Sequence, residues 1–246
     1  MKIVSASLAL VLFACSSDDA PVDATSGADA GASTTGDSGK GGNNVSTEPI
    51  GATNEGEITY YDATGAGACS FDPSPNDLDV AAMNAPQYGN SAPCGSCAKI
   101  TGPKGTLVVR IVDLCPECKK GDLDLSREAF AKLAEPKAGR VKISWEPVRC
   151  DVSGPVSYKI KDGSSRYWTA IQVRNHVRPV AKLELQKGGA WTELKRESYN
   201  YFIGDKGVDG DGPFKVRITS DDGQVLEDTI PGPIADAVSQ GTKNFD

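Results

Sequence analysis

Short runs in which apolar and polar residues alternate cover most of the chain from Gly56 to the C-terminus, and they predict a protein made mainly of β-strands. In the first part, up to Cys150, one segment breaks this pattern. Ser126 is a good N-cap for a helix over residues 127–135, and Pro136 is expected to stop that helix. The predicted strands of this part are rich in β-branched residues: 58–61, 107–112 and 142–146.

From Val156 onward the pattern predicts short strands separated by turns, which is typical of a β-sandwich. Within 214–218, apolar positions alternate with Lys215 and Arg217, as expected of a half-buried strand. Residues 151–155 hold Gly and Pro and are predicted to link the two parts. The predicted strands are 167–175, 181–186, 190–194, 214–218 and 224–230, with hairpin turns at 187–190 and 221–223.

The N-terminus has the pattern of an export signal. One lysine precedes a short apolar run, residues 3–13, which is too short for a membrane-spanning helix. The run ends at Cys15 and resembles a bacterial lipobox, so residues 1–15 are predicted to be a lipoprotein signal peptide with Cys15 lipidated; ordinary secretion with cleavage nearby is the alternative. Because Ser16 follows in place of aspartate, the resemblance implies the outer membrane or the cell surface.

Residues 16–54 are rich in Ala, Ser, Gly, Thr and Asp and hold almost no large apolar side chain. Such a segment cannot bury enough surface to offset its chain entropy, so it is predicted to be a disordered tether. Residues 36–39 (Gly-Asp-Ser-Gly) resemble the nucleophile signature of serine proteases. No folded frame is expected around Ser38, so we attribute this signature to composition.

The chain carries a formal net charge of −7, and most of the acidic excess lies in the tether. The remainder is mildly acidic, which argues against nucleic acid as a partner because phosphate binding needs a basic surface. It also argues against electrostatic docking on anionic lipid, so a membrane is expected only through the lipid anchor. No run of about 18 apolar residues follows the N-terminal signal, so no internal membrane span is predicted.

Six cysteines remain when Cys15 is set aside for lipidation. An even number in an exported protein predicts three disulfides, and fifteen connectivities stay open. A zinc ribbon is the competing interpretation, because two C-x-x-C pairs stand seventeen residues apart. Export favours disulfides, since oxidation outside the cell competes with thiolate binding of metal. The six residues are Cys69, Cys94, Cys97, Cys115, Cys118 and Cys150.

Three stretches carry more information when they are taken together. They are residues 56–60 (GEITY), residues 112–126 (VDLCPECKKGDLDLS) and residues 158–176 (YKIKDGSSRYWTAIQVRNH). In this order they resemble a bacterial expansin over about residues 55–246. The resemblance implies a mainly β fold: a six-stranded double-psi β-barrel over 55–151, then an immunoglobulin-like β-sandwich of the family-63 carbohydrate-binding type over 155–246.

The resemblance also implies a polysaccharide groove on the barrel. Expansins are similar to family-45 endoglucanases but lack the base carboxylate; the retained acid corresponds to Asp124, and groove residues correspond to Thr59 and Asp113, with Tyr60 added as a neighbour. A groove tyrosine of bacterial expansins falls on Cys115, so the chain departs from the family there. On spacing alone, Asp113 and Asp124 fit the two carboxylates that glycoside hydrolysis needs across the sugar bond. The alternative on the residues alone is that Asp124 helps to cap the helix and Asp113 ties down a loop.

By the same resemblance, Tyr167, Trp168 and Tyr199 correspond to a platform of three aromatic rings that stack on sugars, and Lys161 matches a position near it. In a regular strand Tyr167 and Trp168 point to opposite faces, so the pattern by itself exposes Trp168 and buries Tyr167. Both are exposed only if a bulge or a strand start intervenes.

Other chemistry-bearing residues are predicted to be structural. Trp145 and Trp191 lie in apolar alternations typical of core positions, and His176 is expected to be a hydrogen-bonded structural residue. Residues 205–212 resemble a calcium loop only loosely, because the spacing of their aspartates does not fit, so they are predicted to be a flexible hairpin loop. No metal or cofactor is expected.

These observations predict an exported monomer that binds cellulose and related β-glucans and loosens plant-type walls without hydrolysis. Two alternatives stay open. One is a glycoside hydrolase or lytic transglycosylase acting on glucan or peptidoglycan, for which a second carboxylate in the groove would be the discriminating feature. The other is a polysaccharide-binding adhesin of the cell surface, in which the barrel is only a scaffold.

Overall fold

The computed structural model describes residues 48–246, so the predicted signal peptide, Cys15 and most of the tether lie outside the described residues. Its first residues correct the predicted end of the tether at residue 54. Pro49 bridges Val148, and the Ile50 amide donates to the Pro147 carbonyl at 2.9 Å. These backbone hydrogen bonds already join the chain to the folded region at residue 49. Among residues 48–246, no helix has the length and apolar character needed to cross a membrane.

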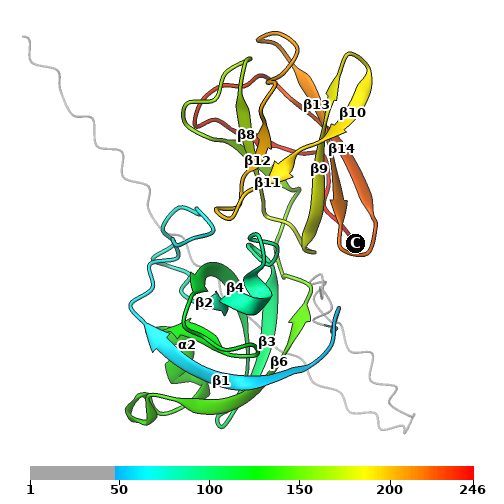
Figure 1. The fold of residues 1–246 in the computed structure, drawn as a ribbon. Coiled ribbons are helices and arrows are strands. Elements are labelled where there is room, and N and C mark those ends of the chain that lie inside the picture. Colours follow the sequence, from blue (N-terminus) through cyan, green and yellow to red (C-terminus); the bar gives the residue numbers. More distant parts are fainter. Residues whose placement is uncertain (1–47) are drawn as a thin grey trace, which may run out of the picture. The chain divides into compact units, whose positions relative to one another are not determined.

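Six strands close into a barrel, drawn in blue to green in Figure 1. Around the barrel, neighbouring strands follow the order β1 (Asn54–Tyr61), β5 (Leu123–Ser126), β2 (Val80–Asn84), β4 (Gly105–Cys115), β3 (Cys97–Gly102) and β6 (Val141–Val148).

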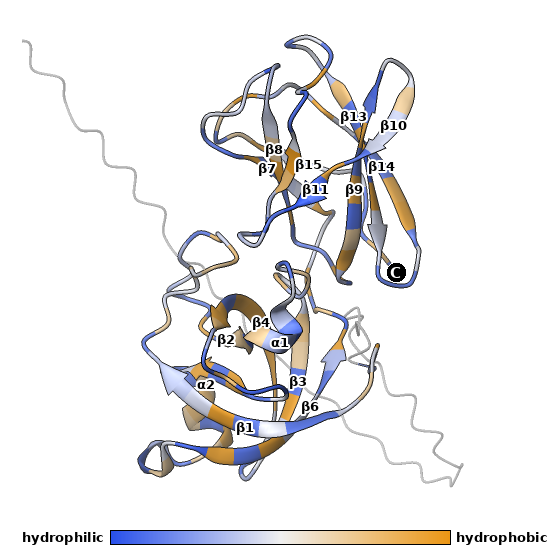
Figure 2. Cartoon of the chain, viewed as in Figure 1, coloured by the Kyte–Doolittle hydropathy of each residue, from blue (hydrophilic) through white to orange (hydrophobic). Residues whose placement is uncertain are grey.

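The barrel is mixed, because β1 runs parallel to β5 and β2 runs parallel to β4, while the other pairs are antiparallel. Its interior is apolar and includes Ile58, Ile100, Leu123 and Leu125, which are fully buried. Figure 2 shows the corresponding bands of apolar and polar residues along β1 and β6. Trp145 is also buried in this core, as predicted.

Helix α2 (Arg127–Leu133) covers one part of the barrel core. Its start agrees with the prediction, because the Ser126 hydroxyl accepts the amide of Ala129 at 2.9 Å and so satisfies one of the free N–H groups of the first turn. The helix ends two residues earlier than predicted, and Pro136 opens a separate 3-10 turn, η1 (Pro136–Ala138). A one-turn helix, α1 (Ala85–Tyr88), follows β2.

The cysteines form disulfides, which excludes the zinc-ribbon alternative. A thiolate metal site needs free sulfur atoms, and the described residues contain no group of three or more His, Cys, Asp or Glu side chains placed to hold a metal ion. The sequence left the connectivity open, and the structure pairs Cys69 with Cys94, Cys97 with Cys150, and Cys115 with Cys118.

The second part of the chain consists of two antiparallel sheets, and with the barrel this confirms the predicted fold class (Figure 1). One sheet has the strand order β10 (Ala190–Glu193), β9 (Val180–Lys187), β13 (Phe214–Ser220) and β14 (Val225–Ile230). The other has the order β11 (Lys195–Arg196), β12 (Phe202–Gly204), β8 (Thr169–Arg174), β7 (Ser157–Ile160) and β15 (Val238–Gln240).

Trp191 does not belong to the core of these sheets, which corrects its predicted position. It lies partly exposed on β10, the edge strand of its sheet, and the Arg217 guanidinium stands 4.6 Å from the centre of its ring. The apolar alternation of this segment was misleading because one face of an edge strand remains open to solvent.

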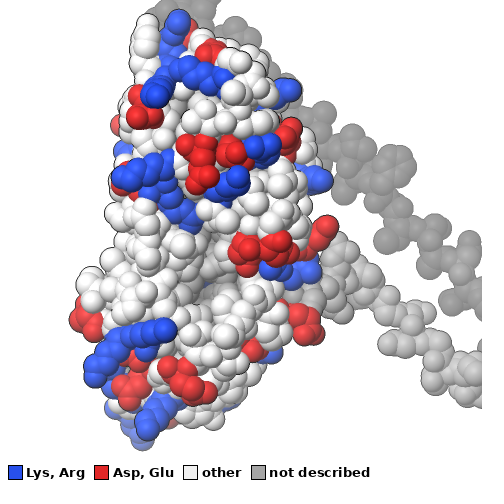
Figure 3. Space-filling view, turned by 45° about the vertical axis from the view of Figure 1, so that its right-hand side comes forward, with Lys and Arg blue, Asp and Glu red and all other residues white. Residues whose placement is uncertain are grey.

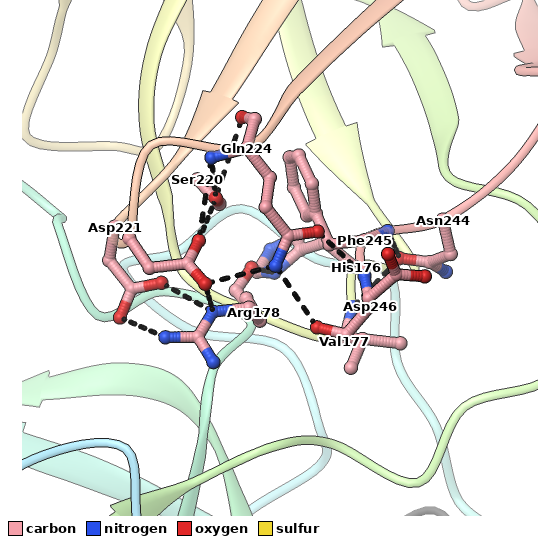
Figure 4. A network of polar contacts seen from close by, with 10 residues as sticks. His176, Val177, Arg178, Ser220, Asp221, Gln224, Asn244, Phe245 and Asp246 are labelled. Carbon is pink, nitrogen blue, oxygen red and sulfur yellow. Dashed lines mark hydrogen bonds and ion pairs between the residues drawn. The ribbon is translucent and has the colours of Figure 1, made fainter.

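The C-terminal residues close the second part of the chain through a polar network (Figure 4). The Asn244 side chain accepts the Val177 amide and donates to the Asn175 carbonyl, and Asp246 and Gln224 exchange two hydrogen bonds. His176, beside this network, is buried, and its Nδ1 lies 2.8 Å from the Arg178 carbonyl. Burial lowers the pKa of His176 to about 4, so the ring is neutral at pH 7 and has the predicted structural character.

A buried hydrogen bond in the second core gives a test of its packing. Tyr158 is fully buried and donates to the Asp228 carboxylate at 2.7 Å, and Asp228 is itself almost fully buried. Tyr158→Phe leaves that carboxylate oxygen without its donor, so we expect the free energy of unfolding to fall by about 1–3 kcal/mol. Denaturant unfolding measures this change.

Tyr201→Phe is the matched control, because Tyr201 is also buried but its hydroxyl has no hydrogen-bond partner among residues 48–246. Its free energy of unfolding should change by less than about 0.5 kcal/mol. Equal losses in the two variants would contradict the importance of the Tyr158–Asp228 bond.

Candidate functional site

Thr59 and Asp124 meet on the outer face of the barrel. They are direct partners in the parallel pairing of β1 with β5, so their side chains point to the same side. The Thr59 hydroxyl donates to the Asp124 carboxylate at 2.6 Å. Asp124 therefore does not cap helix α2, a role that Ser126 fills, and the structure brings these two predicted residues together.

The row continues across two more strands. Ala82 on β2 pairs with Asp124 on one side and with Asp113 on β4 on the other. With adjacent strands about 4.8 Å apart, the two aspartates stand about 10 Å apart at the backbone, separated by a single methyl side chain. A row thus crosses four strands, with polar side chains at Thr59, Asp124 and Asp113 and the small side chain of Ala82 between the two aspartates. The sequence pattern alone does not mark Ala82.

Asp113 also holds a loop in place, as one of the sequence interpretations proposed. Its Oδ1 accepts the amides of Ala68 at 2.7 Å and Leu114 at 2.8 Å. A Cβ added to Gly67 would lie 2.3 Å from the Asp113 carboxyl carbon, so only glycine allows this close approach. The loop around residue 68 is therefore fixed against the groove by Asp113.

Tyr60 does not join this row. Its side chain shares a face with buried Ile58, packs 4.8 Å from Phe130 between ring centres, and carries the Arg127 guanidinium 4.8 Å from its own ring. Because successive residues of a strand point to opposite faces, Tyr61 takes the groove side next to Thr59. Tyr60 was thus placed on the wrong face of the strand, and period-two alternation from Thr59 would have found Tyr61.

The Tyr61 hydroxyl is buried close to the Asp113 carboxylate and makes no well-aligned hydrogen bond among the described residues. Burial raises the pKa of Tyr61, and the charge and hydrogen-bonding capacity of Asp113, together with the charge of Asp124, raise it further. Tyr88 lies in the same neighbourhood: burial and the charge of Asp113 raise its pKa to about 12. Both phenols are therefore neutral at pH 7.

Burial is the main cause that raises the pKa of Asp124 above the ordinary aspartate value. The hydrogen bond from Thr59 opposes this shift, and the negative charge of Glu117 adds to it. Asp124 therefore holds its proton more tightly than an ordinary aspartate, as suits a group that donates or shares a proton with a bound sugar.

A polar cleft of about 330 Å³ opens beside Thr59. The Cys115–Cys118 disulfide and Glu117 border it, so a short covalent ring lies at the position where the family resemblance implied a departure. Glu117 has no mark in the sequence pattern, and only the fold shows it at the cleft. The residues that line the cleft are Glu57, Thr59, Cys115, Glu117, Cys118, Lys119, Asp122 and Arg140.

Charges of both signs surround the candidate surfaces. Arg140 pairs with Glu57 at 3.2 Å at the cleft, and Figure 3 shows cationic and anionic side chains interspersed on the visible face.

Trp168 and Lys161 share the outer face of the five-stranded sheet. Ile160 and Ile171 point into the core, so the alternate positions point outward. Lys161 follows β7 and donates its amide to the Ala170 carbonyl at 2.9 Å, which sets it opposite Ala170 on this outer face. Trp168 lies two residues before Ala170, so it points to the same outer face, and its side chain is partly exposed.

Tyr167 precedes β8 instead of lying within it, which resolves the parity conflict between Tyr167 and Trp168. The strand begins at Thr169, two residues later than predicted, and Ser165 bridges Trp168 to close a tight turn with Tyr167 inside it. Tyr167 is 75% exposed as a result. The strand therefore starts after Tyr167 and Trp168, which is one of the conditions under which both rings can be exposed.

Tyr199 lies in the turn between β11 and β12, 36% exposed, and its ring centre is 6.0 Å from that of Tyr201. Tyr201 directly precedes Phe202, whose side chain is in the core, so Tyr201 points to the outer face of the same sheet. No contact joins the rings of Tyr167, Trp168 and Tyr199 to one another in the described part of the chain.

The same sheet face contacts the barrel segment that Asp113 holds. The Gln172 amide donates to the Cys69 carbonyl at 2.9 Å, and the Asn200 amide donates to it at 3.2 Å. Arg174 pairs with Asp72 at 2.5 Å. The segment 68–72 is therefore hydrogen-bonded to Asp113 at residue 68, and its residues 69 and 72 contact side chains of the second part of the chain.

Comparisons with known proteins agree with this geometry. A family model of double-psi β-barrels, described as lytic transglycolase, matches residues 53–145. Expansin-YoaJ of Bacillus subtilis (strain 168) is 42% identical over 182 residues, which are 72% of this chain and 78% of that protein.

Two solved structures are similar over both parts of the chain. The crystal structure of the apo expansin of Clavibacter michiganensis has a TM-score of 0.71 at 34% identity, covering 78% of this chain and 98% of that chain. A mutant of that expansin in complex with cellohexaose has a TM-score of 0.72 at 33% identity, with the same coverage.

The raised pKa of Asp124 predicts a pH-dependent cost to stability. Between its unfolded and folded pKa values the folded state binds more protons than the unfolded state, so stability falls as pH rises through that window. Asp124→Asn removes the ionisation while its carbonyl still accepts from Thr59. We expect a higher free energy of unfolding than wild type at pH 7, and no difference below the unfolded pKa.

Denaturant unfolding across pH measures this difference. Asp151→Asn is the control, because Asp151 is exposed and has no ion pair in the described part of the chain, so its substitution should change the free energy of unfolding by less than about 0.5 kcal/mol. An Asp124→Asn variant that is less stable than wild type at pH 7 would overturn the burial argument.

Proposed function

The chain belongs to the expansin family, and from that membership we propose that it binds cellulose and related β-glucans and loosens plant-type cell walls without hydrolysing them. The observation that carries the proposal is the row formed by Thr59, Asp124 and Asp113 beside an open polar cleft. Such a row offers hydroxyl and carboxyl groups to a sugar chain that lies across several strands of the barrel. The cellohexaose complex of the similar Clavibacter protein supports a glucan as the ligand class.

In this proposal Asp124 acts on hydrogen bonds and not on the glycosidic bond. A half-buried carboxyl with a raised pKa accepts from a glucan hydroxyl and, when it is protonated, donates to a glucan oxygen, and Thr59 fixes its orientation. Protein–glucan hydrogen bonds then replace glucan–glucan ones, and neighbouring chains slip. Tyr61, whose hydroxyl makes no well-aligned hydrogen bond among the described residues, supplies another group on the same side.

We assign binding to the second part of the chain, residues 155–246, and the groove to residues 55–151. Trp168, Tyr167 and Tyr199 are exposed or partly exposed on or beside one sheet, with Lys161 on its outer face, and exposed aromatic rings stack well on the apolar faces of pyranoses. Export through the N-terminal signal and lipidation of Cys15 remain parts of the proposal. The disulfides support a place outside the cytoplasm.

Lytic action on glucan or peptidoglycan is the second candidate, and two observations favour it. The barrel matches a family model described as lytic transglycolase, and Glu117 places a further carboxylate at the cleft next to Thr59. Sugar-bond hydrolysis needs such a second carboxylate. Expansins lack the endoglucanase base, and therefore the non-lytic function is preferred.

The first functional prediction concerns Asp124. In the Asp124→Asn variant we expect extension of isolated plant walls to be lost, because the amide cannot hold or release the carboxyl proton, while pull-down on solid cellulose stays at the wild-type level. Wall creep under constant load measures the first quantity. Creep at the wild-type rate would remove Asp124 from the mechanism.

The same samples decide between the two candidate functions. Sugar ends released from amorphous cellulose and from peptidoglycan are counted for wild type, Asp124→Asn and Glu117→Gln. No release by any of the three supports the non-lytic function. Release by wild type that either substitution removes would establish the lytic function in its place.

The second functional prediction concerns the aromatic residues. Trp168→Ala should lower affinity for solid cellulose by about 2 kcal/mol, which is about thirtyfold, if roughly half of the ring stacks on sugar. Trp191→Ala is the matched control, since Trp191 is also a partly exposed tryptophan but lies on the other sheet under Arg217. Equal binding by wild type and Trp168→Ala would contradict the proposal that the exposed aromatic rings bind cellulose.

A further inference from the structure

Arg166 accompanies Tyr167 in the tight turn before β8. Its guanidinium lies 5.2 Å from the centre of the Tyr167 ring, and its Nη1 lies 3.5 Å from the Asp211 carboxylate. Tyr167 keeps 75% of its surface open to solvent in this arrangement. One face of the ring is therefore near a cation, and the ring as a whole stays available to a ligand.

The loop that follows β12, residues 205–212, holds the turn from the other side. The Val208 amide donates to the Arg166 carbonyl at 2.9 Å, while the Val208 side chain is anchored in the core. Gly207 has φ +63°, and a Cβ there would lie 1.9 Å from the Arg166 carbonyl oxygen, so the loop and the turn are in direct backbone contact.

The far side of this loop is tied to the β9–β10 hairpin. The Gly188 amide donates to the Asp209 carboxylate at 2.8 Å, and Lys187 donates to the Lys206 carbonyl at 2.5 Å. Two of the three aspartates that loosely resembled a calcium loop thus have structural partners, Asp209 at the hairpin and Asp211 at Arg166. The flexible loop predicted from the sequence is held at both sides.

We propose that Arg166, held by Asp211 and by the 205–212 loop, is a positioning residue that presents the Tyr167 ring to a pyranose ring of the glucan. The guanidinium covers one ring face and leaves the other for the sugar. This inference rests on the proposed function, because it gives a role to a residue beside the glucan platform.

The physical reason is the entropy of an exposed side chain. A tyrosine on a surface turn samples several rotamers, and a ligand that stacks on it must order it. A cation against the ring is attracted by its negative face, and an ion pair limits where that cation can be. The ring is then partly ordered before the sugar arrives, and it does not depend on neighbouring aromatic rings for support.

A double-mutant cycle on the full chain tests this role, with cellohexaose as the probe in titration calorimetry. The four proteins are wild type, Arg166→Gln, Tyr167→Ala and the double variant. We expect Arg166→Gln to weaken cellohexaose binding about threefold to fivefold, the size of a cation–π contact at an exposed site. In the Tyr167→Ala background the same change should have no effect, because Arg166 acts through the ring.

Lys206→Gln is the matched control, because it removes one positive charge from the 205–212 loop that contacts the turn of Arg166, and its side chain contacts no ring in the described residues. Its affinity should equal that of wild type. The tyrosine signal in near-ultraviolet circular dichroism should weaken in Arg166→Gln at an unchanged melting temperature, which a role in stability alone would not produce.

The outcomes separate this inference from the proposed function. Full binding by Arg166→Gln, or an equal loss in both backgrounds, overturns the positioning role while Tyr167 remains a platform residue. Full binding by Tyr167→Ala shows that this ring is not part of the platform, and the inference falls with it.

The loop offers a second, independent test of the same role. Gly207→Ala and Gly210→Ala both place a side chain at positive φ, +63° and +78°, but only the first meets the Arg166 carbonyl, whereas the second projects into open space. We expect cellohexaose binding to weaken in Gly207→Ala and not in Gly210→Ala. Equal effects of the two variants would mean that the contact between loop and turn does not position Tyr167.

Discussion

The parallel pairing of β1 with β5 is the constraint on which the candidate groove depends. In this register Thr59 lies opposite Asp124. The antiparallel pairing of β2 with β5 and its parallel pairing with β4 extend the row through Ala82 to Asp113. A shift of one residue would turn the fully buried Leu123 or Leu125 outward and the polar row inward. The same apolar residues that fill the barrel therefore fix the place of the polar ones on its surface, and function follows from the packing of the opposite face.

The groove retains groups that a purely structural surface would not favour. Asp124 is partly buried with a raised pKa, and the Tyr61 hydroxyl is buried without a well-aligned hydrogen bond in the described part of the chain. Both features cost stability in the absence of a ligand, and both leave hydrogen-bonding capacity for a sugar. The disulfides and the hydrogen bonds of Asp113 to the loop at residue 68 hold the surroundings in place. In the proposed function, a glucan would meet groups that are already oriented.

Local constraints hold two parts of the candidate surface. The Cys115–Cys118 disulfide closes a short covalent ring at the cleft and sets Glu117 beside it. Tyr167 lies in the turn before β8, with the Arg166 guanidinium near its ring. Segment 68–72, bonded to Asp113 and to the outer face of the sheet, couples the two regions.

The amino-acid sequence by itself determined the mainly β architecture, the start of helix α2 at Ser126 and the disulfide character of the six cysteines, and through the family resemblance it named Thr59, Asp113 and Asp124 as groove candidates. Only the tertiary structure decided the disulfide connectivity, the surface position of Trp191 and the presence of Glu117 at the cleft. It also showed that Tyr61, and not Tyr60, lies on the groove side of β1. The physical reason is that alternation and capping act between residues a few positions apart, so a local pattern records them. Register, strand ends and edge positions depend on which distant strands pair, and Asp124 and Asp113 become neighbours across Ala82 only when β2 inserts between their strands.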